Sequence, residues 1–152
     1  MKFSMSLAAI LLAYAVPAAA QTVTSCDRWE ARAENLAEPW EEMSRTFANG
    51  AVRIAVIDVI EPAAGALHLL ILSPPYSELG ERQCRMISAG ANGFAGIRFA
   101  DLTAGYDPQT GLGFDVPVQI FDPQSADFIG AGLGFTVNQA TGKVSANIYP
   151  VD

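Results

Sequence analysis

The most constraining feature of the sequence is a series of strand-like runs that fills the chain after Gly50. These runs are rich in β-branched and aromatic residues, and Gly, Pro, Asn and Asp separate them at hairpin spacing. They comprise residues 51–60, 66–72, 82–89, 94–102, 112–121, 128–137 and 143–149. Consecutive strands without helices between them favour antiparallel pairing. The sequence therefore predicts an antiparallel sheet or half-barrel of about seven strands.

The segment before these strands has a helical periodicity instead. Its apolar residues recur at steps of four and three, and acids and arginines lie between them. They are Trp29, Ala33, Leu36, Trp40, Met43 and Phe47. We expect a helix over Asp27 to Ala48 that kinks or divides at Pro39, with Asn35 to Glu38 as a capping box and Asn49-Gly50 as its end. The predicted fold class is α+β, with this N-terminal amphipathic helix packed on the sheet.

The first twenty residues have the pattern of a secretory signal peptide. Lys2 precedes a short apolar run at residues 7–16, and small alanines follow it up to Ala20. The apolar run is too short to span a bilayer, so no permanent membrane anchor is expected. Cleavage before Gln21 would leave residues 21–152 as one globular domain. We predict a periplasmic or secreted protein, with a Gram-negative bacterium as the favoured source.

The two cysteines, Cys26 and Cys84, would enter an oxidising compartment together. Their default state there is a disulfide, which in the chain-entropy model would stabilise the fold by roughly 4 kcal/mol. A redox pair would lie closer in sequence, and a zinc site would need more ligands than these cysteines and His68 supply. We therefore predict a disulfide that joins the N-terminal helix to the sheet, and no metal site.

The charge balance argues against nucleic acid as a partner. The chain has 16 acidic and 9 basic residues, for a formal net charge of −7, and its arginines form no cluster. Nucleic-acid affinity depends largely on basic side chains that neutralise phosphates. We expect no cofactor. An envelope protein, a small molecule or a glycan is the expected partner.

Two short segments resemble a known enzyme family. Ser73-Pro74-Pro75-Tyr76, after a buried strand, resembles the catalytic loop of the DNA amino-methyltransferases, and residues 128–132 resemble their donor-binding loop. The resemblance implies a parallel sheet with alternating helices and a basic cleft, whereas this chain is acidic and rich in consecutive strands. We therefore interpret the two prolines as the end of a strand, since proline cannot donate to a ladder.

Glycines occupy one face of the strand predicted at residues 128–137. Gly130, Gly132 and Gly134 alternate with apolar residues, which gives one apolar face and one bare face. Such positions usually accommodate something that packs closely. Internal packing is one interpretation. The other is a ligand or partner groove that also involves Tyr76 and Tyr106.

Candidate catalytic groups are few. His68 is the sole histidine, and a triad would require it to meet Ser73 or Ser88 and an acid such as Asp58. No nucleophile-elbow pattern supports this arrangement. A glycosidase-type carboxylate pair is a further alternative, although the aspartates beside proline and glycine are typical of turns.

These observations favour a small exported binding or protein-interaction domain whose ligand the sequence leaves unidentified. Catalysis is the less favoured function. One alternative is a small periplasmic hydrolase that uses His68 or a carboxylate pair. Another is a structural envelope component that assembles through the glycine-faced strand.

Overall fold

The computed structural model describes residues 21–151, and the predicted signal peptide, residues 1–20, lies outside this range. The described chain contains ten strands, four short 3₁₀ turns and no α-helix. The strands are β1 Gln21–Ser25, β2 Ser44–Phe47, β3 Val52–Asp58, β4 Leu67–Tyr76, β5 Arg82–Ala89, β6 Gly96–Ile97, β7 Thr103–Asp107, β8 Gly111–Asp122, β9 Asp127–Val137 and β10 Val144–Pro150. The 3₁₀ turns are η1 Trp29–Ala31, η2 Ala33–Asn35, η3 Ala63–Gly65 and η4 Phe99–Asp101. The predicted α+β class is therefore wrong, and the fold is all-β.

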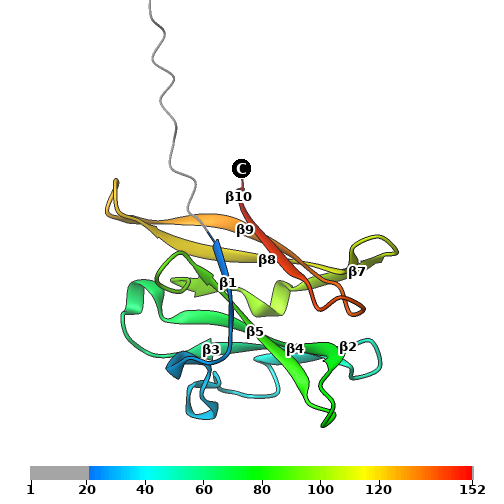
Figure 1. Cartoon of the computed structure of the whole chain (residues 1–152). Helices are drawn as coiled ribbons and strands as arrows, with labels where there is room; N and C mark the ends of the chain where they lie inside the picture. Colours follow the sequence, from blue (N-terminus) through cyan, green and yellow to red (C-terminus); the bar gives the residue numbers. More distant parts are fainter. Residues whose placement is uncertain (1–20, 152) are drawn as a thin grey trace, which may run out of the picture.

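The strands form two antiparallel sheets that face each other. Sheet A has the order β1-β5-β4-β3-β2, and sheet B has the order β10-β9-β8-β6, with β7 also pairing β8. Figure 1 shows the two layers, with β7 to β10 above β2 to β5. The predicted antiparallel pairing is confirmed. The prediction of a single sheet of about seven strands is wrong, because ten strands divide between two layers.

The two inner faces form the main core. Side chains alternate across each strand, so every second residue of β3, β4, β8 and β9 enters the space between the sheets. Phe114 lies near the middle of this packing, with its ring centroid 4.9 Å from those of both Phe47 and Phe135. The core residues on the longest strands are Phe114, Val116, Val118, Ile120, Ala131, Leu133, Phe135 and Val137.

The predicted N-terminal helix over Asp27 to Ala48 is wrong. Residues 26–43, here called the strap, cross sheet A as short turns, and residues 44–47 form β2 instead. The strap is fixed by backbone hydrogen bonds to β3: the N–H of Ala37 donates to the carbonyl of Val56 at 3.0 Å, and the N–H of Val56 donates to the carbonyl of Met43 at 2.9 Å. A helix would use these strap groups internally, and short helices gain little without packing.

Asn49-Gly50 forms a hairpin turn rather than a helix end. Ala48, Asn49 and Gly50 have φ values of 50°, 54° and 85°. Positive φ values of this kind are typical of the tight turns between paired strands. The turn joins β2 to β3, in the register that pairs Phe47 with Val52.

The outer face of sheet A has a smaller apolar cluster under the strap. Ala55, Ile57 and Leu70 form its buried centre, and Ala31 and Leu36 of the strap pack against it. The strap therefore covers this face, as the predicted helix would have done, but with extended and 3₁₀ backbone.

The predicted disulfide between Cys26 and Cys84 is confirmed, with a Cα–Cα distance of 5.4 Å. The antiparallel register of β1 with β5 explains the pairing, since Ser25 lies opposite Arg85, Cys26 follows Ser25 and Cys84 precedes Arg85. The bond fixes the start of the strap to β5. It is consistent with an extracellular or periplasmic protein.

Two strand boundaries differ from expectation. β4 continues through Ser73-Pro74-Pro75 to Tyr76, with a register irregularity at this point, so the prolines do not end the strand. The run at residues 94–102 contains only the two-residue β6 followed by η4. Among residues 21–151, no helix is long and apolar enough to cross a membrane.

Candidate functional site

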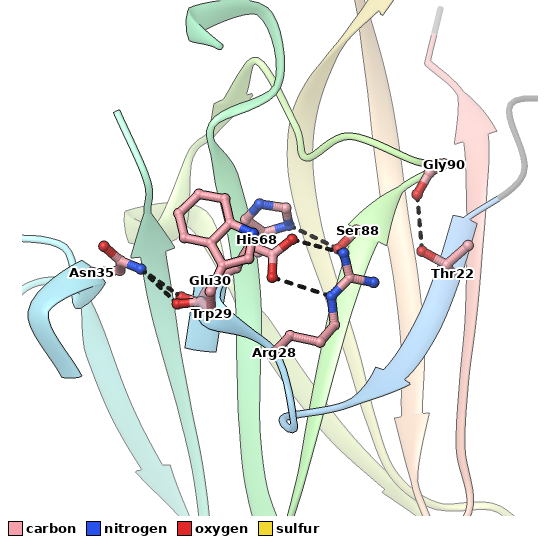
Figure 2. Close-up of polar contacts among 8 residues, drawn as sticks. All are labelled: Thr22, Arg28, Trp29, Glu30, Asn35, His68, Ser88 and Gly90. Carbon is pink, nitrogen blue, oxygen red and sulfur yellow. Dashed lines mark hydrogen bonds and ion pairs between the residues drawn. The ribbon is translucent and has the colours of Figure 1, made fainter. Parts of the chain in front are cut away.

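The first candidate site is a polar cluster under the strap (Figure 2). His68 on β4 lies opposite Ser88 on β5, because the register pairs the neighbouring Leu69 with Ile87. The His68 Nδ1 and Ser88 Oγ atoms are 2.8 Å apart. Both residues are buried, with exposed fractions of 5% and 6%. The sole histidine thus contacts Ser88, one of the two serines that the sequence offers as a partner for it.

The strap adds a charged pair to this cluster. Arg28 binds the Glu30 carboxylate through two contacts, Nη2 to Oε1 at 2.7 Å and Nε to Oε2 at 3.2 Å. Asn35 fixes the same turn by donating from Nδ2 to the carbonyls of Trp29 and Glu30, both at 3.1 Å. Glu30 is 7% exposed, and its burial is compatible with charge because its oxygens are paired.

The protonation preferences follow from these contacts. Hydrogen bonds from Arg28 hold the pKa of Glu30 below its ordinary value. Burial lowers the pKa of His68, and the nearby Glu30 charge only partly opposes this effect. His68 is therefore favoured as the neutral imidazole, which can hydrogen-bond Ser88 as donor or acceptor.

The chemical capacity of this cluster is limited by access. A catalytic serine must reach a substrate carbonyl, and Ser88 is almost completely covered. The acid beside His68 is engaged by Arg28 rather than hydrogen-bonded to the imidazole. The arrangement is that of a satisfied structural hydrogen bond between two strands, closed over by the strap.

The other two predicted catalytic candidates lie elsewhere. Asp58 accepts a hydrogen bond from the backbone N–H of Ile60 at 2.8 Å. Ser73 is fully buried and accepts one from Nε2 of Gln83 at 2.9 Å. Along β4, positions 68 and 73 have opposite parity and face opposite sides of the sheet. The structure does not bring His68, Asp58 and Ser73 together.

The glycine row on β9 is partly covered by a tyrosine of the same sheet. Gly132 lies opposite Tyr149 of β10, and Gly134 lies opposite Asp115 of β8. The Tyr149 ring crosses Gly132, and its hydroxyl donates to Asp115. This hydrogen bond raises the pKa of Tyr149. A side chain at position 132 would overlap the ring, so a close internal contact accounts for this glycine.

The tyrosines predicted to flank the glycine row are on different sheets. Tyr76 ends β4 in sheet A and is 54% exposed, whereas Tyr106 is on β7 of sheet B and is 70% exposed. Neither tyrosine lines the cleft beside Gly130, which is the third candidate site.

This cleft of about 520 Å³ lies between β6, β8, β9 and the residue after β10. Most of its wall is aliphatic, and Arg98 is the only charged residue among the described lining residues. The lining comprises Leu67, Gly96, Ile97, Arg98, Pro117, Val118, Gln119, Gly130, Ala131 and Val151. Because Leu67 belongs to sheet A, the cleft involves both sheets, unlike the troughs over β7–β8 and β8–β10, which involve sheet B alone.

An exposed apolar surface adjoins the cleft. Phe121 and Phe128 lie opposite each other on the hairpin between β8 and β9, with ring centroids 5.7 Å apart. They are 42% and 50% exposed. Side chains two residues apart on a strand share a face, so these rings lie on the same face as Gln119 and Gly130. The glycine pattern predicts a groove at Gly130, but the cleft itself depends on strand order, which residue patterns do not give.

The described chain defines a disulfide-linked antiparallel β-sandwich. No family model, curated protein or solved structure matches it.

Proposed function

We propose that this protein is a small exported binding protein that holds a small, mainly apolar ligand in the cleft between β6, β8 and β9. The supporting observation is the cleft itself, because about 520 Å³ lies within the range of small-molecule sites. Such sites typically combine apolar walls with a few polar groups, here Arg98 and Gln119. The disulfide supports action in the periplasm or outside the cell.

A neutral fluorescent probe, N-phenyl-1-naphthylamine, tests this proposal. We expect its emission to rise on binding to the wild-type protein. Gly130→Phe should abolish the rise, since a side chain at this position would extend beside Val151, 3.7 Å from the added Cβ. The matched control is Gly113→Phe on β8, where the added Cβ has no neighbour within 4 Å. Equal loss in both variants, or no binding by the wild type, would refute the proposal.

The hydrolase alternative has one observation in its favour, the 2.8 Å contact between Ser88 and His68. A fluorophosphonate reagent labels serines that a neighbouring base activates. Labelling of Ser88 in the intact, oxidised protein, and its loss in His68→Gln, would support catalysis. We expect no labelling, because the strap covers both side chains.

A further inference from the structure

The cleft has an asymmetric distribution of polar groups. Its aliphatic residues, among them Leu67, Ile97 and Val118, offer no side-chain hydrogen bond. The two polar side chains, Arg98 and Gln119, belong to the β6 side and to β8. A sugar requires polar groups around its ring, so this lining disfavours a glycan. A molecule with a hydrocarbon body and one polar end matches it better.

Arg98 lies at the solvent side of the cleft, with its side chain 73% exposed. Its Nε contacts Oδ2 of Asp101 at 3.3 Å, and Asp101 is itself 56% exposed. Among the described residues, neither Nη group of Arg98 has a hydrogen-bond partner. An exposed ion pair of this kind is weak, so the guanidinium keeps most of its capacity to bind an anion. Its planar array of donors matches a carboxylate or phosphate.

The apolar surface continues beyond the cleft. Val151 lies near Gly130, and Phe121 and Phe128 lie on the same face as Gln119 and Gly130, two residues away on β8 and β9. All three apolar side chains are between 42% and 51% exposed. Exposed apolar surface that adjoins a cleft is typical of a ligand-binding surface. A flexible hydrocarbon chain that extends out of the cleft could contact this apolar surface, whereas a compact ligand within the cleft could not.

We propose that the ligand is an anionic amphiphile, whose hydrocarbon chain occupies the cleft and whose carboxylate or phosphate head binds Arg98. This inference depends on the proposed function, because it names the ligand class of the same cleft. Arg98, the one cation among the cleft's described lining residues, provides the charge complementarity in a protein whose net charge otherwise repels anions.

Displacement of N-phenyl-1-naphthylamine by ten-carbon amphiphiles, below their micelle concentrations, tests the head group. We expect decanoate and decyl phosphate to displace the probe at about tenfold lower concentration than decanol or decyltrimethylammonium, as one charge-assisted contact would give. The tighter of the two anions identifies the head group. Equal displacement by all four compounds would overturn the assignment while leaving the proposed function intact.

Two variants assign the preference to Arg98. Arg98→Gln should remove the preference for anions and leave unchanged the concentration of decanol that displaces the probe. Asp101→Asn should strengthen it, because Arg98 would lose a competing carboxylate. The control is Arg82→Gln, which alters an arginine on β5 of sheet A, outside the cleft lining. An unchanged preference in Arg98→Gln would refute the role of this residue, and thermal melting confirms that each variant is folded.

Discussion

A methyl group at position 132 would collide with the ring of Tyr149. A Cβ built on Gly132 overlaps Cζ, Cε2 and the hydroxyl oxygen of that ring, well inside van der Waals contact. The ring is held over β9 by its hydrogen bond to Asp115, so Gly132→Ala would require it to move. The substitution therefore tests whether Tyr149 occupies the position described.

Two opposing effects determine how much Gly132→Ala changes the free energy of unfolding. Overpacking typically costs about 1–3 kcal/mol, and replacing glycine by alanine inside a strand typically stabilises by about 0.5–1 kcal/mol. Gly132→Ala should therefore lower the free energy of unfolding by roughly 1–2 kcal/mol. In a Tyr149→Ala background the collision is absent, so the same change should be neutral or slightly stabilising. The coupling between the two positions should be about 1.5–3 kcal/mol.

Urea unfolding of the wild type, the two single variants and the double variant measures this coupling. Gly113→Ala on β8 is the matched control, because its added Cβ meets nothing within 4 Å. It should be neutral or stabilising. If Gly132→Ala destabilised the protein equally with and without Tyr149, the ring would not lie over β9.

Three further predictions concern the strap and the polar cluster beneath it. Replacing Cys26 and Cys84 by alanine should lower the free energy of unfolding by roughly 4 kcal/mol, given their separation of 58 residues, and an unchanged urea midpoint would contradict this. Stability should also fall as the pH drops below about 6.5, because the unfolded chain then protonates His68 more readily than the folded protein, and His68→Gln should flatten this part of the profile. A second loss should begin below about 4.5, where protonation of Glu30 removes its pairing with Arg28.

Several strands coincide with segments predicted from the sequence. Residues 82–89 coincide with β5, and the last three predicted strands match β8, β9 and β10 to within about two residues. The disulfide was also predictable, because a chain with two cysteines has a single internal pairing. A strand is recognised from its own residues, and two cysteines can form one internal disulfide. Neither prediction therefore requires the order of the strands in the sheets.

The prediction of an N-terminal helix was wrong because the spacing of the apolar residues fits both a helix and a series of turns. Apolar steps of three and four place side chains on one face of a helix, but the turns of the strap place Leu36 and Ala31 against sheet A as well. β1 was missed because Gln21–Ser25 contains a single apolar residue, Val23. The His68–Ser88 contact required the register of β4 with β5, which residue patterns alone did not fix.

The position of the cleft follows from a proline in the middle of sheet B. The carbonyls of Pro117 and Gln119 accept hydrogen bonds from Arg98 and Ala95, so this edge of β8 faces the β6 segment. A residue in an antiparallel strand presents its N–H and C=O to the same side, so the missing N–H of Pro117 is on that edge too. β6 ends beside it, at Ile97, and β7 begins only at Thr103. Since no donor at position 117 can extend the ladder, the chain leaves the sheet there, and the gap places Arg98 at the cleft.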